Sequence, residues 1–349
     1  MTICVGIDEN GLGPRLGPLV VTAVAARVEG DGHKRLVARP RGGLRSRLGD
    51  SKRLVAYGDS GLGEAWARAI VARTRAGAAR PGEPQAAEDP AARAISDPEA
   101  LVHALSLDSP DDLRAPCPRE HLQQCWASSG EAFVADEKLV TTVGRDLDRL
   151  EAQGVAVLYA RLVVTCTRRL NEGVERGLTR FHLDLHAMER LALDARERVG
   201  ADVLATCGKV GGFDRYPAAF GPMNGRLYAV AQEGRARSEY SVPGLGTIAF
   251  VRDAEDKHLL VSMASLVGKW VRDALMARIV RYHRSDDPAL PDASGYHDPV
   301  TTRFIKATRL TRRSRALPDD CFERRAWGDS ISGTRASRSA SGPSRPSSA

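Results

Sequence analysis

Two adjacent acids, Asp8 and Glu9, end the first apolar run of the chain, and a loop with three glycines and two prolines follows them. A second acidic group, formed by Asp253, Glu255 and Asp256, separates another apolar run from a long amphipathic segment. Carboxylates from distant parts of a chain are the hard oxygen ligands that Mg²⁺ or Mn²⁺ needs, and a pair of such ions can cleave a phosphodiester. Alternatively, the first pair closes a hairpin and the second group is a solvated turn at a helix N-terminus.

The elements around these acids predict an α/β chain. Residues 3–7 and 18–27 have the character of strands, and the loop between them predicts a hairpin connection. Residues 182–199 predict an amphipathic helix that leads into a short strand at 201–206, and residues 246–284 predict a strand, an acidic turn and a long helix. Neighbouring residues of a strand point to opposite faces, so Asp8 and Glu9 can share a site only where their strand ends.

The composition is that of an ordinary globular protein, with 349 residues, 42% apolar residues and a net charge of +7. This modest basic excess suits a polyanionic partner. The six cysteines are scattered without a CxxC pair, so their spacing suggests neither a zinc site nor a disulfide framework. The sequence has no signal peptide and no apolar stretch long enough to span a membrane, so we expect a cytoplasmic protein without membrane contact.

Four segments together resemble the type 2 ribonucleases H, which comprise ribonucleases HII and HIII. The opening GIDENGLGPRLGPLVVTAVA resembles the first motif of that family, and LGDSKRL its Asp-Ser-Lys segment. AEDKHLLVSMASLVGKWVRDALM resembles the stretch in which an acid precedes Ala-Ser and later Lys and Arg-Asp, and SGYHDPVTTRF resembles the late Gly-Tyr segment. The resemblance implies a ribonuclease H-like α/β fold, with a mixed central sheet and flanking helices.

The resemblance also implies roles for individual residues. Asp8 and Glu9 match the first two metal-binding carboxylates of the family, and Glu255 matches its fourth acid, with Asp256 as the alternative one residue on. The remaining matched positions would bind the substrate: Gly11, Leu12 and Gly13 at the loop that reads the 2′-hydroxyl, Lys52 and Lys269 near the scissile phosphate, and Tyr296 stacking at the RNA–DNA junction. From the residues alone, Lys52 and Lys269 could equally be solvated or snorkelling side chains.

The chain departs from the family pattern at two places. Leu12 stands where the family has Arg or Lys between two glycines. The third family acid, expected at the end of the strand after residue 201, falls on Cys207 or Gly208, neither of which is a suitable magnesium ligand. Asp214 follows a few residues later, and we interpret it as a possible compensating ligand if the intervening glycines fold the loop inward.

The domain prediction follows from the resemblance and from composition. We predict a ribonuclease H-like domain over residues 1–300, with a partly loose insertion at 78–135 that is rich in proline and acids. A basic C-terminal extension over 301–328 and a disordered Ser/Arg/Pro tail over 329–349 would follow.

The resemblance implies an Mg²⁺- or Mn²⁺-dependent endonuclease that cleaves the RNA strand of RNA–DNA hybrids, and we expect it to act as a monomer. The alternative is a catalytically impaired relative that binds nucleic acid without efficient turnover, because it lacks the third carboxylate.

Overall fold

The computed structural model describes residues 1–77, 95–117, 123–211 and 213–325. Part of the predicted insertion at 78–135 therefore lies outside the described residues, as does the whole predicted tail at 329–349.

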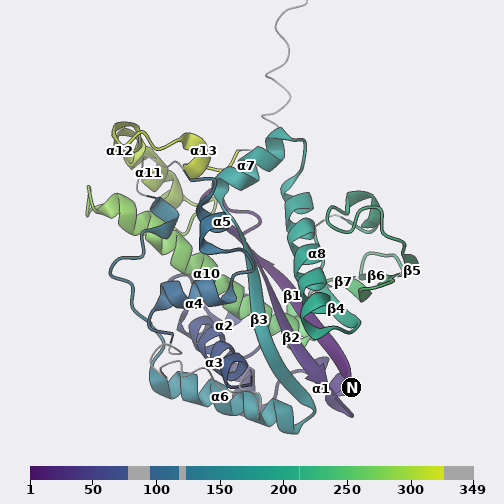
Figure 1. Cartoon of the computed structure of the whole chain (residues 1–349). Helices are drawn as coiled ribbons and strands as arrows, with labels where there is room; N and C mark the ends of the chain where they lie inside the picture. Colours follow the sequence, from purple (N-terminus) through teal and green to yellow (C-terminus); the bar gives the residue numbers. More distant parts are fainter. Residues whose placement is uncertain (78–94, 118–122, 212, 326–349) are drawn as a thin grey trace, which may run out of the picture.

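A seven-stranded sheet in the order β3-β2-β1-β4-β7-β6-β5 forms the centre of the molecule (Figure 1). β1 runs parallel to β4 and β4 runs parallel to β7, whereas the pairs β1–β2, β2–β3, β6–β7 and β5–β6 are antiparallel. The strands are β1 (Thr2–Asn10), β2 (Leu19–Val28), β3 (Val155–Thr165), β4 (Val203–Gly208), β5 (Ala229–Gln232), β6 (Arg237–Val242) and β7 (Gly246–Val251). The expected α/β fold, a mixed central sheet with flanking helices, is confirmed.

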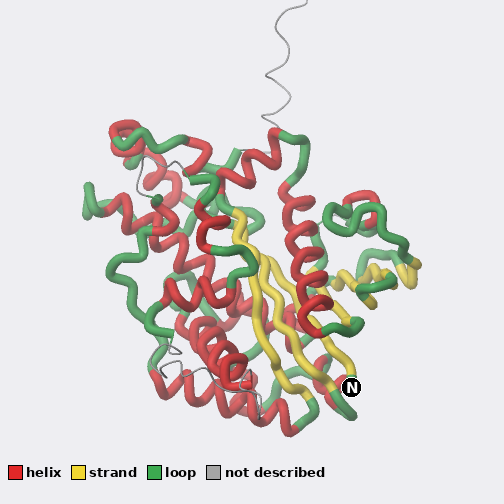
Figure 2. The backbone as a smooth tube through the Cα atoms, viewed as in Figure 1, coloured by secondary structure: helices red, strands yellow, loops and turns green. Residues whose placement is uncertain are grey.

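Helices cover both faces of the sheet (Figure 2). One face carries α3 (Gly61–Gly77), α4 (Pro98–Leu105), α6 (Glu137–Ala152) and α10 (Leu259–Arg284), and the other carries α8 (Arg180–Val199). The shorter helices are α1 (Gly32–Leu36), η1 (Gly42–Ser46), α2 (Ser51–Leu54), α5 (Pro110–Arg114), η3 (Gln124–Trp126), α7 (Thr167–Glu175), η4 (Pro217–Ala219), α9 (Ala254–Lys257), α11 (Pro299–Ala307), α12 (Arg309–Ser314) and α13 (Asp319–Phe322). In the part of the chain that the structure describes, none of the helices has the length and hydropathy to cross a membrane.

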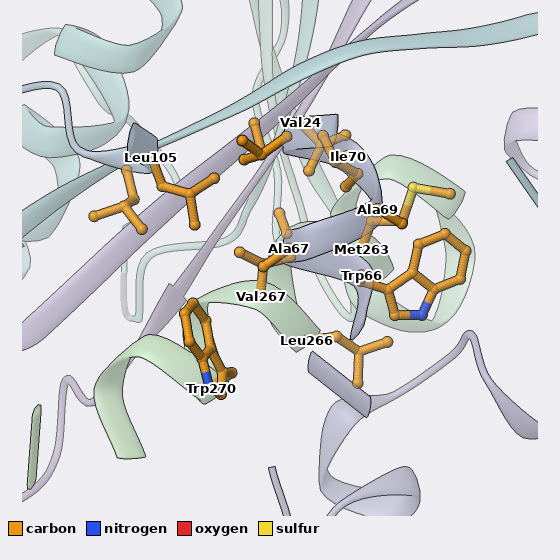
Figure 3. Packing of buried hydrophobic residues seen from close by; sticks show 14 of the residues in the cluster. Val24, Trp66, Ala67, Ala69, Ile70, Leu105, Met263, Leu266, Val267 and Trp270 are labelled. Atoms are coloured by element: carbon orange, nitrogen blue, oxygen red, sulfur yellow. The ribbon is translucent and has the colours of Figure 1, made fainter. Parts of the chain in front are cut away.

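Side-chain alternation along β1 divides the core into two layers. Ile3, Val5 and Ile7 pack under α8, whereas Cys4 faces the helices on the opposite side. The layer that contains Cys4 is the larger of the two, and Figure 3 shows Trp66 of α3 and Trp270 of α10 packed within it. Because β1 and β2 are covered on both faces, their ends are held rigidly and can position side chains for chemistry.

Two glycines let α10 lie directly on the central strands. A Cβ on Gly6 of β1 would lie 2.4 Å from the backbone of Leu260, and one on Gly268 of α10 would lie 2.7 Å from the Thr22 hydroxyl. Any larger residue at either position would push the helix away from the sheet. This close approach brings the middle of α10 beside the end of β1.

The segment after residue 299 packs back onto the body of the protein. Phe304 of α11 and Phe322 of α13 join Leu16, Met276 and Ile279 in a third buried cluster. Through this cluster the basic C-terminal segment meets both α10 and the loop between β1 and β2.

Candidate active site

Three parallel strands bring the predicted acids to one edge of the sheet. The carboxyl ends of β1, β4 and β7 lie side by side, because the β1–β4 ladder ends at Ile7 and Cys207 and the β4–β7 ladder ends at Gly208 and Val251. Asp8 and Glu9 extend β1 beyond its last pair with β4, so their flank on that side is open. Carboxyl ends of parallel strands are the usual place for ligand sites in open α/β sheets.

Gly208 lies opposite both carboxylates of β1. A Cβ built on this glycine would lie 3.0 Å from Asp8 Oδ1 and 3.7 Å from Glu9 Oε2. Both acids therefore reach the same space, although they are adjacent on one strand. Of the two positions expected for the third family acid, Gly208 faces this space, whereas Cys207 is fully buried in the core under α8.

Glu255 reaches the same space from a tight turn after β7. Asp253 adopts a left-handed conformation, with φ of 55°, and directly precedes the short helix α9 that carries Glu255. The Glu255 carboxylate lies 3.9 Å from the ammonium group of Lys52 on α2. This contact joins the second acidic group to the segment predicted to bind phosphate.

A pocket of ≈ 390 Å³ collects most of the predicted site residues. Its lining includes Asp8, Glu9, Gly11, Leu12, Gly13, Lys52, Glu255, Lys269 and Tyr296, together with Asn10, Ser51, Gly208, Lys209, Arg252, Asp253, Ser265, Arg272 and Asp273. Among the described residues, Asp214 and Asp256 do not line it. Asp214 instead forms an ion pair of 3.0 Å with Lys209, which does line the pocket.

The carboxylates of the pocket are held in an environment that disfavours their charge. Burial, followed by the neighbouring charges of Glu9 and Glu255, raises the pKa of Asp8 well above its ordinary value. Burial, reinforced by the charge of Glu255, raises the pKa of Glu9 to about 7. Such clusters of carboxyls with raised pKa values are typical of functional sites, where a bound cation can relieve the repulsion.

The opposite wall of the pocket is basic. Lys269 and Arg272 of α10 both pair with the carboxylate of Asp273, each at 3.2 Å. The Arg272 guanidinium also lies 4.5 Å from the ring centroid of Tyr296, whose side chain is half exposed. Within the described ranges, the Nε of Arg272 is buried without a hydrogen-bond partner, although the residue lines the pocket. The wall therefore holds two cations that are paired with Asp273, and it offers the half-exposed ring of Tyr296 to a ligand that carries rings.

One acid near this edge was missed by sequence reasoning. Asp184 lies on α8 and is fully buried, and among the described residues neither of its carboxylate oxygens has a hydrogen-bond partner. Burial and then the charges of Glu9 and Asp8 raise its pKa well above the ordinary value. A signal was present in the sequence, since Asp184 shares a helix face with Met188, Leu191 and Ala195, which all lie in the core.

The donor chemistry of the pocket fits an oxygen-liganded divalent cation. Asp8, Glu9 and Glu255 supply carboxylate oxygens, and the bare face of Gly208 leaves space beside the first two. Among the described residues, however, no three acidic, histidine or cysteine side chains are already arranged to hold an ion. An ion would therefore have to draw the three carboxylates together.

Comparisons with known proteins give similar solved structures but no family. No protein-family model matches the chain, and no curated protein matches it in sequence. Ribonuclease HII of Archaeoglobus fulgidus, solved in a complex with PCNA, is 16% identical with a TM-score of 0.40, covering 93% of this chain and 95% of that one. Ribonuclease H2 of Pyrococcus horikoshii is 13% identical with a TM-score of 0.41, covering 94% and 95%. A mutant of Bst-RNase HIII is 11% identical with a TM-score of 0.36, covering 88% and 70%. At such values the similarity says nothing of what the pocket does.

Proposed function

We propose that this protein is a divalent-metal-dependent endonuclease that cleaves the RNA strand of RNA–DNA hybrids. One observation carries the proposal: carboxylates from two distant segments, Asp8, Glu9 and Glu255, face a single pocket whose other wall is basic. Acids that converge in this way suit metal ions, and the basic wall suits the phosphates of a nucleic acid. The choice of a hybrid substrate rests on the sequence resemblance to type 2 ribonucleases H.

In this proposal, Asp8, Glu9 and Glu255 hold Mg²⁺ or Mn²⁺, which supplies a Lewis acid for the attacking water and the leaving 3′ oxygen. Lys52 and Lys269 neutralise the phosphate charge next to the acids. The half-exposed ring of Tyr296 offers a stacking surface for a base or sugar. The backbone of Gly11 to Gly13 lines the pocket and would contact the 2′-hydroxyl that distinguishes RNA from DNA.

A second candidate function is favoured by Gly208. Because this residue has no side chain, the position facing Asp8 and Glu9 supplies no carboxylate. The protein would then bind hybrids through the basic wall of the pocket but turn them over poorly. The loss of one metal ligand costs several kcal/mol of transition-state stabilisation in sites of this kind, on the order of 10² to 10³ in rate.

The two candidates are separated by one set of assays on the purified full chain. Cleavage of a labelled RNA–DNA hybrid is measured with Mg²⁺, with Mn²⁺ and with a chelator, and hybrid affinity is measured in parallel. Endonuclease activity that Asp8→Asn abolishes supports the first candidate, with Asp202→Asn as a control, since Asp202 is exposed and precedes the opposite end of β4. Affinity without cleavage supports the second candidate, and the absence of both contradicts each of them.

The setting of the activity is part of the proposal. We propose that the protein acts on hybrids as a monomer in the cytoplasm, without membrane contact. Size-exclusion chromatography with light scattering, with and without a short hybrid, tests the oligomeric state.

A further inference from the structure

The loop between β1 and β2 forms one wall of the pocket, and its shape depends on residues far along the chain. Gly11, Leu12 and Gly13 line the pocket, and the loop then continues through Pro14 to Gly17. Gly11 and Gly17 both have positive φ, at 90° and 81°, so the loop turns sharply at its two ends. Such a loop has little regular structure of its own and needs external contacts to hold a single shape.

The side chain of Arg324 supplies four of these contacts from the C-terminal segment. Its Nη1 donates to the carbonyl of Gly11 at 2.6 Å and to that of Leu12 at 3.3 Å. Its Nε and Nη2 donate to the carbonyl of Gly17 at 2.9 and 2.7 Å. One guanidinium therefore ties together both ends of the loop.

The environment of this guanidinium is unusual for a charged group. Arg324 is only 4% exposed, and within the described part of the chain it has no ion pair with a carboxylate. The charges of Arg180 and Arg272 act on it unfavourably, because both are also cations. Burying an unpaired charge is costly, and here the loop carbonyls are what compensates it. The arginine and the loop therefore depend on each other.

Neighbouring contacts hold the same loop from two further sides. The backbone N–H of Arg324 donates to the carbonyl of Arg15 at 2.9 Å, and the amides of Arg15 and Leu16 donate to the carbonyl of Gly295 at 2.8 and 3.1 Å. Gly295 directly precedes the pocket residue Tyr296. The loop is thus fixed between the C-terminal segment and the segment that carries the aromatic ring.

We infer that Arg324 is a positioning residue of the pocket, which acts through the backbone of the loop from Gly11 to Gly17. Arg324 does not itself line the pocket in the described structure, so any effect on a ligand must pass through that loop. The inference makes the C-terminal segment a working part of the site rather than a solvated basic extension. The expected effect of Arg324 on hybrid binding rests on the proposed function. Its expected effect on the shape of the loop does not.

The test compares Arg324→Lys and Arg324→Ala with the matched control Arg325→Ala. Arg325 is the adjacent arginine, and its side chain pairs with Glu175 and Asp320 rather than with the loop. Lysine keeps the charge but cannot bond three carbonyls in a fork, so Arg324→Lys serves if the alanine variant does not fold. Hydrogen exchange of the Arg15 and Leu16 amides reports the loop directly, and hybrid affinity and the split between KM and kcat report the pocket.

The expected result is faster exchange of these two amides in both Arg324 variants, on the order of tenfold or more, with amides in the centres of β1 and β4 unchanged. Free guanidinium at millimolar concentration should restore protection in Arg324→Ala, which a general loss of stability would not allow. If the wild-type protein cleaves hybrids, KM should rise in the same variants while kcat falls less, and if it only binds them, hybrid affinity should fall. Unchanged amide exchange in Arg324→Lys and Arg324→Ala would overturn the inference, whatever the activity. Changed exchange in a protein without hybrid affinity would support the inference and contradict the proposed function.

Discussion

Asp8 points at the bare face of Gly208, so that a Cβ on the glycine would lie 3.0 Å from the Oδ1 of the acid. The position is therefore close to the carboxylates of β1, yet it contributes no ligand to them. The neighbouring thiol of Cys207 does not fill the gap, because it is fully buried on the other face of β4. The pocket therefore has no carboxylate at the position that faces Asp8 and Glu9.

Gly208→Asp should strengthen divalent-cation binding and hybrid cleavage, each by about tenfold or more, because it adds a carboxylate beside two others. Isothermal titration with Mn²⁺ measures the first effect and a labelled hybrid the second. Gly208→Asn is the matched control, since it has nearly the same volume without the charge. Equal behaviour of the two variants would show that the added charge is irrelevant to the pocket.

Glu255 and Asp256 are neighbours on α9, but only Glu255 lines the pocket. Glu255→Gln should lower cleavage by about a hundredfold or more, because it removes a proposed ligand. Hybrid affinity should persist or increase, since a negative charge is lost near the phosphates. Asp256→Asn should change both by less than about threefold. Comparable losses of cleavage in the two variants would argue against the assignment of Glu255 over its neighbour.

Asp184 is a buried carboxyl close to Asp8 and Glu9, and it has no hydrogen-bond partner in the part of the chain that the structure describes. Asp184→Asn should raise the free energy of unfolding at pH 8 by about 1–3 kcal/mol in the presence of a chelator, because it replaces a carboxyl whose charged form the core does not stabilise. Asp194→Asn, on the same helix but paired with Arg198 near the surface, should be neutral or slightly destabilising. Urea denaturation measures both changes. A clear loss of stability in Asp184→Asn would mean that the carboxyl has a stabilising partner.

The sequence predicted the parts of the site that lie in short, locally ordered segments. Asp8 and Glu9 follow an apolar run and precede glycines, and this local pattern is sufficient to indicate a strand end. Asp184 was missed because an acid within an amphipathic helix is normally assigned to the polar face. Arg324 was missed because it lies in a run of basic residues, which the sequence alone cannot divide into buried and exposed members.

The cysteines show that a sequence pattern also fails to predict contacts between residues far apart in the chain. Cys117, Cys125, Cys166 and Cys321 line one small cavity, although their spacing in the sequence suggests no site. They come from four separate segments, and only tertiary packing brings these together. All six cysteines are free thiols in the structure.

His283 should make the protein sensitive to acid. It is fully buried on α10 in contact with Gln124, and burial, followed by the charges of Arg312 and Arg315, lowers its pKa to about 4. The ordinary value of 6.5 applies in the unfolded chain. Between pH 6.5 and 4 the unfolded state therefore binds a proton at His283 that the folded state excludes, and the contribution of His283 to the free energy of unfolding falls as the pH falls.

The loss should reach on the order of 2–3 kcal/mol for His283 by pH 4, at about 1.4 kcal/mol for each unit of pKa shift. His258, whose pKa is also lowered to about 4 by burial and then by Arg237, should contribute over the same window. Between pH 7 and 4.5, His283→Gln should therefore lose less unfolding free energy than the wild type, by on the order of 2–3 kcal/mol, as measured by urea denaturation. His33→Gln, at an exposed position on α1, should leave the slope unchanged. A slope that is equally steep in His283→Gln and in the wild type would contradict this account of the buried histidine.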